Sequence, residues 1–264
     1  MSNIVFYCSF VNRKIGIFAL LIVAAMVLLG GCANVDAGGG GNIVQGTGPM
    51  VSRSFQVDDF AELEVGGGSS FTVIFRQSDN ISVTIEMQEN LFDFHEVSVR
   101  HGSLSVARAT RDRIVYYYYR PRVYINAPFL TAINVNGALH AEDWDAIATQ
   151  NFSIVSNGFV AISAPLEVDT LELDLSGASE LEFWGDAHTV IITKNGAGSI
   201  IAGGLQTTEA EINLNGAGEV IIAVSDNLDA TLEGVGNIRY IGNPIVTQNI
   251  GRTAIGSISR VDQD

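Results

Sequence analysis

The chain has only two cysteines, Cys8 and Cys32, among its 264 residues. A small scaffold held together by several disulfides is therefore excluded. The four histidines are scattered, and none stands at metal-ligand spacing from a cysteine or from a second histidine. The chain also lacks the Gly-x-Ser-x-Gly elbow, the P-loop and the dinucleotide-binding fingerprint. We therefore expect no metal site, no cofactor and no enzymatic activity.

Basic residues are scarce as well: 14 lysines and arginines stand against 29 aspartates and glutamates, which gives a net charge of −15. A surface of this sign repels nucleic acid and anionic lipid and favours solubility. Charged residues make up only 16% of the chain and hydrophobic residues 47%, which is the composition of a packed domain. We expect no nucleic-acid partner.

An apolar run near the N-terminus, residues 15–29, is shorter than the ~20 residues that comfortably span a bilayer. Arg13 and Lys14 precede this run, and it ends in Leu29-Gly30-Gly31-Cys32. That order predicts a secretory signal peptide over residues 1–31. The tetrapeptide resembles the bacterial lipobox, whose cysteine carries the lipid and becomes the first residue of the mature protein. We therefore expect Cys32 to be lipidated; an uncleaved anchor and cleavage by an ordinary signal peptidase are the alternatives.

Residues 32–50 are predicted to form a flexible tether, because they are rich in glycine and show no strand pattern. Loss of residues 1–31 would leave 12 basic against 29 acidic residues, a net charge of −17, with Cys32 as the only cysteine. In a diderm envelope the usual retention signal at the position of Ala33 is Asp. We therefore expect a lipid-anchored protein of the bacterial cell envelope, in the outer membrane if the host is diderm.

A short phrase centred on glycine recurs through the second half of the chain. Its glycines are 21, 19, 19, 20 and 18 residues apart, and self-similarity at such a period is typical of stacked structural repeats. We predict that each of these glycines forms a structural turn. The six phrases are Asn136-Gly137-Ala138, Asn157-Gly158-Phe159, Ser176-Gly177-Ala178, Asn195-Gly196-Ala197, Asn215-Gly216-Ala217 and Glu233-Gly234-Val235.

The residues around each glycine predict what is stacked. The positions four before and four after it are aliphatic in every unit, and apolar and polar residues alternate around them. This alternation predicts strands with one buried face, and a unit of about 20 residues is too short for a strand and a return helix. We predict an all-β, single-domain parallel β-solenoid, similar to a right-handed β-helix, over residues 51–264. Its first half, from Phe55 to Ile125, lacks the phrase and is expected to be a more irregular β region.

Asparagine precedes the glycine in four of the six phrases. Stacked asparagines can hydrogen-bond from coil to coil, and glycine supplies positive φ at a sharp corner. This predicts a structural corner, with a ligand groove as the alternative. Lys194 departs from the pattern, because alternation points it inward in a column that also holds Leu175 and Leu214. It either snorkels to solvent at the corner or is buried, with an ion pair or a shifted pKa.

An aromatic and basic segment is the candidate for ligand binding. On a strand, Tyr116 and Tyr118 would face one side and Tyr117 and Tyr119 the other, so one pair is expected to be exposed beside arginines on an otherwise acidic protein. Tyrosine with arginine suits contacts with glycans, peptides or proteins. The alternative is an edge strand whose rings cover the solenoid. The candidate residues are Tyr116, Tyr117, Tyr118, Tyr119, Arg120 and Arg122.

Residues 52–245 resemble the bacterial family described as putative auto-transporter adhesin, head GIN domain. The resemblance rests on the iterated Ser/Asn-Gly-Ala turns, on Arg53-Ser54-Phe55 and on Ala127-Pro128-Phe129-Leu130. It implies a secreted or lipid-anchored β-helical domain with no known catalytic residues. We therefore expect a surface module that binds a glycan, the cell wall or a surface protein, or that serves in envelope structure. The alternative, a polysaccharide-active enzyme of the pectate-lyase-like kind, is supported by fold analogy alone.

Overall fold

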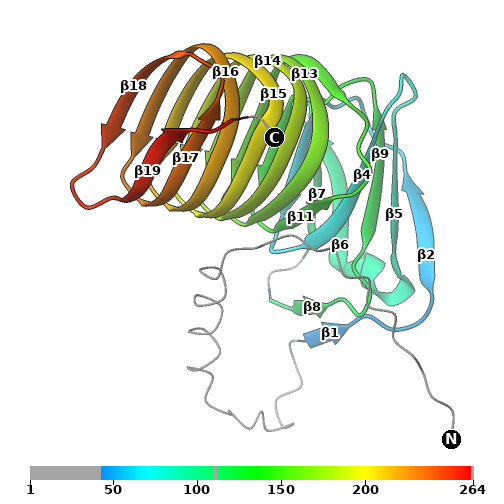
Figure 1. The fold of residues 1–264 in the computed structure, drawn as a ribbon. Coiled ribbons are helices and arrows are strands. Elements are labelled where there is room, and N and C mark those ends of the chain that lie inside the picture. The colour runs from blue at the N-terminus through cyan, green and yellow to red at the C-terminus, as the bar shows by residue number, and fades with distance from the viewer. Residues whose placement is uncertain (1–42, 110–111, 263–264) are drawn as a thin grey trace, which may run out of the picture. The chain divides into compact units, whose positions relative to one another are not determined.

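The computed structural model describes residues 43–109 and 112–262, and these ranges are mostly β-strand (Figure 1). The one helix within them is the 3₁₀-helix η1 (Glu89–Phe94). The strands of the first half are β1 (Ile43–Gln45), β2 (Met50–Phe55), β3 (Glu62–Gly66), β4 (Ser70–Gln77), β5 (Ser82–Gln88), β6 (His95–Arg100), β7 (Ser103–Arg108), β8 (Ile114–Tyr116) and β9 (Arg122–Ala127). Those of the second half are β10 (Ala132–Val135), β11 (Ala138–Ala141), β12 (Ile147–Ser156), β13 (Phe159–Leu175), β14 (Ala178–Lys194), β15 (Ala197–Leu214), β16 (Ala217–Leu232), β17 (Val235–Ile241), β18 (Ile245–Ile250) and β19 (Ile255–Arg260).

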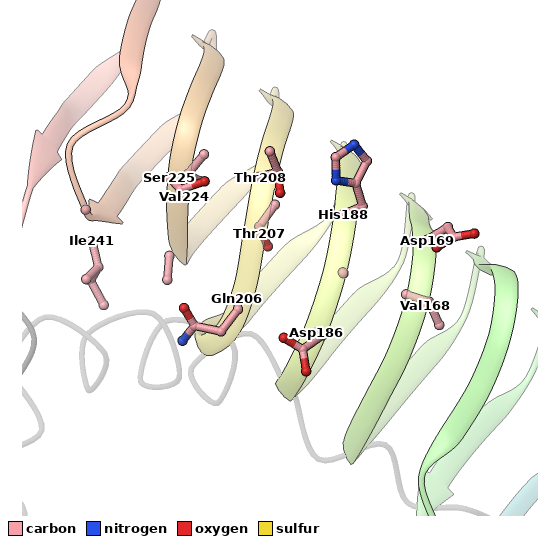
Figure 2. Close-up of a pocket in the computed structure, with 13 residues that line it drawn as sticks. Val168, Asp169, Asp186, His188, Gln206, Thr207, Thr208, Val224, Ser225 and Ile241 are labelled. Atoms are coloured by element: carbon pink, nitrogen blue, oxygen red, sulfur yellow. The ribbon is translucent and has the colours of Figure 1, made fainter.

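From β10 onward the chain winds into stacked coils (Figure 1), and each glycine phrase marks a turn within one coil. The residues before and after the turn pair in parallel with their counterparts in the next coil. Leu173, for example, lies between Ile154 and Ile192 of the adjacent coils. Halfway between successive glycine turns each coil bends again, and part of this mid-coil region is drawn in Figure 2. The predicted parallel β-solenoid is confirmed.

The first half of the chain belongs to the same stack. β3 and β4 pair in parallel with β10 and β11, so that Leu63 lies beside Ile133. On their other side β7 and β9 pair in parallel with β3 and β4 and add one more coil. β5 and β6 then pair antiparallel with β9 and β7, and β2 pairs antiparallel with β5, which covers the edges of that coil. The region expected to be irregular therefore consists of two further coils and an antiparallel cap.

The folded part begins before residue 51, where the sequence placed the start of the domain. β1 pairs with β8 in a separate two-stranded parallel sheet, and Val44 packs against the hydrophobic core. The expected signal peptide, Cys32 and the first part of the tether lie outside the described residues. Within the described ranges, no helix has the length and apolar character needed to cross a bilayer.

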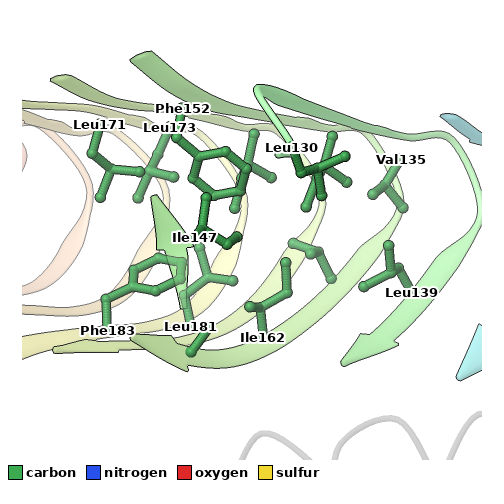
Figure 3. Packing of buried hydrophobic residues seen from close by; sticks show 14 of the residues in the cluster. Leu130, Val135, Leu139, Ile147, Phe152, Ile162, Leu171, Leu173, Leu181 and Phe183 are labelled. Atoms are coloured by element: carbon green, nitrogen blue, oxygen red, sulfur yellow. The ribbon is translucent and has the colours of Figure 1, made fainter. Parts of the chain in front are cut away.

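The interior of the coils is filled by aliphatic and aromatic side chains (Figure 3). The column four residues before each glycine is buried in every coil, from Ile133 to Ala230. Phe152 and Phe183 add bulk to this interior and are also fully buried. Burying each such large apolar side chain, compared with leaving it in water, stabilises the fold by about 1.5–3 kcal/mol. Because neither cysteine lies in the described part of the chain, burial and strand pairing stabilise the stack there.

The turn glycines are required because neighbouring coils approach closely there, and not because of positive φ. Positive φ occurs two residues later, at Gly198, Gly218 and Gly236, and not at the turn glycines themselves. A Cβ atom on Gly216 would lie 2.0 Å from the carbonyl oxygen of Gly196 in the previous coil. The prediction of positive φ is therefore wrong at this position. Stacked turns approach each other so closely that only a hydrogen atom fits.

The asparagines beside these glycines pair across neighbouring coils. The amide of Asn157 donates to Oδ1 of Asn136 at 3.2 Å, and that of Asn215 donates to Oδ1 of Asn195 at 3.0 Å. Ser176 occupies the coil between the two pairs. The stacked amides thus stabilise the corner locally, as expected for a structural turn.

Candidate functional site

The candidate tyrosines lie where β8 ends and an irregular connection leads to β9. β8 stops at Tyr116, so the alternation of a strand does not continue through the next three tyrosines. Tyr116, Tyr118 and Tyr119 are all more than half exposed, whereas Tyr117 turns inward and packs against the core. Three tyrosines therefore face solvent in place of the expected pair.

Tyr117 is held in place by His95, a residue to which the sequence analysis gave no role. Nδ1 of His95 donates to the carbonyl of Leu91 at 2.8 Å, which leaves Nε2 to accept from the Tyr117 hydroxyl at 2.6 Å. Burial lowers the pKa of His95 and raises the pKa of Tyr117. Both groups are therefore favoured in their neutral forms, and they fix the inner side of the tyrosine segment.

Three of the six candidate residues meet at one hollow. This hollow, of about 380 Å³, is lined by Met50, Thr72, Glu86, Tyr119, Arg120 and Arg122. The rings of Tyr118 and Tyr119 meet edge to face, with centroids 4.8 Å apart. Arg122 lies 3.6 Å from a carboxylate oxygen of Glu142. Exposed aromatic rings beside guanidinium donors suit a ligand that carries hydroxyl or carboxylate groups.

Lys194 lies inside the solenoid and is fully buried, so the expectation that it snorkels to solvent is wrong. Its Nζ atom donates to Ser179 Oγ at 3.2 Å and to the carbonyl oxygen of Gly196 at 3.4 Å. Among the described residues no carboxylate lies within ion-pair distance of it. Burial lowers the pKa of Lys194 to about 8. It is a buried lysine with a shifted pKa.

A groove that the sequence analysis missed runs along the mid-coil bends (Figure 2). Its volume is about 520 Å³, and its polar lining consists of Asp169, Asp186, His188, Gln206, Thr207, Thr208 and Ser225. Figure 2 shows His188, Thr208 and Ser225 following one another across adjacent coils. The signal in the sequence is a second column of residues at the repeat spacing: His188 comes 19 residues after Asp169, and Thr208 comes 20 residues after His188. The residues of this column differ in type (Asp169, His188 and Thr208), so they do not form a repeated phrase as the glycine turns do.

The mid-coil groove is acidic and polar. It contains two carboxylates, and none of its lining residues is a lysine or an arginine. Such a groove can hydrogen-bond a neutral or cationic ligand and disfavours an anionic one. In the part of the chain that the structure describes, no group of three or more histidines, cysteines and carboxylates is arranged to hold a metal ion.

Comparisons with known proteins identify relatives of this fold. Residues 59–244 match the model of a family described as "Putative auto-transporter adhesin, head GIN domain". A solved structure of a putative adhesin from Bacteroides fragilis NCTC 9343 is similar with a TM-score of 0.71 at 20% identity, over 83% of this chain and 100% of that one. A putative lipid binding protein from Parabacteroides distasonis ATCC 8503 gives 0.66 at 22% identity, over 83% and 100%. At such identities the two structures show a shared fold. No curated protein matches the chain.

Proposed function

Because the chain belongs to the family "Putative auto-transporter adhesin, head GIN domain", we propose that it is a lipid-anchored module of the bacterial cell envelope that binds a ligand without turning it over. The ligand is a glycan, the cell wall or a surface protein. The lipobox-like Leu29-Gly30-Gly31-Cys32 supports an anchor on Cys32, and Ala33 favours the outer membrane in a diderm host. The adhesin names of structurally similar proteins support a surface location.

The hollow beside Tyr118 and Tyr119 is the proposed binding surface, and it is the observation that carries the proposal. Arg120 and Arg122 supply planar guanidinium donors that pair well with carboxylates and hydroxyls, and the tyrosine rings offer rigid contact area. The chain is acidic overall, with a net charge of −15. An anionic ligand is therefore repelled over much of the surface and is better accepted at this hollow, where two arginines stand against one lining carboxylate, Glu86. An acidic glycan is the chemistry that fits best.

Binding by purified protein to a glycan array and to cells tests this surface. We expect Tyr119→Ser combined with Arg120→Ser to weaken binding by about tenfold or more, the loss typical of a residue that anchors an interface. Arg100→Ser is the control, because Arg100 is an exposed arginine on β6 with one loose ion pair, at 3.8 Å to Glu96. Unchanged binding by a folded double variant would remove the hollow from the site. Release of shortened chains from a bound glycan would instead favour a polysaccharide-active enzyme.

A further inference from the structure

The β1–β8 sheet turns an apolar surface to the solvent. On the outer side of this two-stranded sheet, Ile43 pairs with Ile114 and Gln45 pairs with Tyr116. Ile43 is 68% exposed, Ile114 60% and Tyr116 57%. None of the four side chains carries a charge at neutral pH. We define these four residues as the β1–β8 face.

The β1–β8 face is firmly attached to the rest of the domain. Val44 and Val115 lie between its residues on the inner side and pack against the core. The side chain of Asn90, in η1, donates to the carbonyl of Gln45 at 2.8 Å and accepts from the amide of Thr47 at 2.9 Å. An isolated two-stranded sheet is marginally stable, so these contacts set its position. A surface that covers the face therefore also orients the solenoid.

The face is close in sequence to Cys32. The ten residues 33–42 separate Cys32 from Ile43, and they include Gly38-Gly39-Gly40-Gly41. Ten residues span at most about 36 Å even when fully extended. A lipid on Cys32 would therefore present the face to the bilayer at an effective concentration on the order of millimolar. At such a concentration an apolar contact with a Kd below about a millimolar is mostly occupied.

We propose that the β1–β8 face rests in the membrane–water interface and thereby fixes the orientation of the solenoid above the bilayer. The proposal rests on the lipid anchor proposed at Cys32. The exposed isoleucines gain free energy on leaving water, and a tyrosine ring with a polar hydroxyl suits the level of the lipid headgroups. Because the face is uncharged, the contact depends on apolar burial and not on anionic lipid, which a protein of negative net charge avoids.

Residues 116–120 would then contact two different partners, the membrane and the proposed glycan ligand. Tyr116 belongs to the membrane-facing strand, whereas Tyr119 and Arg120 line the proposed ligand hollow. Exposed isoleucines also occur on the last coil, where Ile245 is 76% exposed and Ile255 68%. Because the last coil lies at the opposite end of the solenoid from β1 and β8 (Figure 1), the tether does not hold it close to the lipid. The last coil therefore provides a matched control.

A synthetic anchor separates this proposal from the question of lipidation in the cell. The chain from Cys32 onward contains every strand of the structure and a single cysteine, so its thiol can be coupled to a maleimide lipid in phosphatidylcholine vesicles. Ile114→Trp and Ile245→Trp place a fluorescent indole on the face and on the last coil, and the unsubstituted chain gives the background of the two native tryptophans. Brominated acyl chains quench an indole that reaches the acyl boundary.

We expect brominated vesicles to remove most of the emission that Ile114→Trp adds and none of the emission that Ile245→Trp adds, with little effect of salt. Adding Ile43→Ser to Ile114→Trp should restore part of the emission. Equal quenching of the two reporters, or quenching that appears only when phosphatidylglycerol is included, would overturn the proposal. Palmitate labelling in cells tests the native anchor independently, so either idea can fail while the other stands.

Discussion

Replacing the buried lysine of the solenoid by methionine should stabilise the domain. Lys194 lies between Leu175 and Leu214 of the adjacent coils, so an apolar side chain of similar length fits the column. Its hydrogen bonds to Ser179 Oγ and to the Gly196 carbonyl are long, at 3.2 and 3.4 Å, and both acceptors are neutral. The ammonium charge is therefore poorly compensated when the chain folds.

The lowered pKa gives the size of this penalty. Burial lowers the pKa of Lys194 from 10.5 to about 8, and a difference of this size corresponds to a loss of about 3 kcal/mol in the free energy of unfolding at pH 7. Loss of the two hydrogen bonds offsets part of the gain, so Lys194→Met should raise the free energy of unfolding by about 2 kcal/mol at pH 7. Because the unfolded chain binds this proton more tightly, wild-type stability rises as the pH increases from about 8 to 10.5. The variant lacks that rise.

Urea unfolding of both proteins at pH 7 and at pH 10 measures the difference and its pH dependence. The difference in the free energy of unfolding between Lys194→Met and the wild type should be larger at pH 7 than at pH 10. Leu214→Met, in the same column, is the control for repacking and should change stability by less than about 1.5 kcal/mol. If Lys194→Met is less stable than the wild type at pH 7, or if this difference does not narrow at pH 10, the charge is not the source of the penalty.

Three further tests concern the turn glycine, the hydrogen bond between His95 and Tyr117, and the lipid. Gly216→Val should lower the free energy of unfolding by about 3 kcal/mol or more, because its Cβ would lie 2.0 Å from the Gly196 carbonyl oxygen. Glu219→Ala, the control, removes one partly exposed ion pair worth at most about 1 kcal/mol. Equal urea midpoints for the two variants would contradict the close approach of the turns. The pKa of His95 is lowered, so its contribution to stability is complete above the ordinary histidine pKa of about 6.5 and is lost as the pH falls below it. His95→Gln should reduce this acid sensitivity, and identical pH profiles would argue against it. Cys32→Ala should abolish palmitate labelling and membrane partitioning; an unlabelled wild type and a variant that partitions unchanged would rule out lipidation.

The solenoid could be predicted from the repeated phrase because stacking imposes the same constraints on every coil. Ile154, Leu173 and Ile192 face one interior column, and each must be apolar. The two coils of the first half could not be predicted in the same way. β3 and β4 stack on β10 and β11, although the cap strands and the tyrosine segment lie between them in the chain. Pairing across such a separation depends on tertiary packing, which local alternation does not reveal.

The candidate site was only partly visible in the sequence. The tyrosines could be singled out by composition, but their directions depend on where β8 ends and on the hydrogen bond between His95 and Tyr117. The close approach at Gly216 is likewise a property of two neighbouring coils. The mid-coil groove needs the register of neighbouring coils before His188 of β14 and Thr208 of β15 can be placed side by side on one surface.

Binding without turnover is the central claim, and the fate of a captured glycan tests it most directly. The chain from Cys32 onward is immobilised and exposed to a mixture of glycans from bacterial envelopes and from animal cell surfaces. The retained glycans are eluted and analysed by mass spectrometry. We predict that acidic glycans are retained, that they elute with unchanged mass, and that Tyr119→Ser combined with Arg120→Ser reduces the retained amount by about tenfold or more. Elution of shortened glycans, or equal retention by the folded double variant, would contradict the claim.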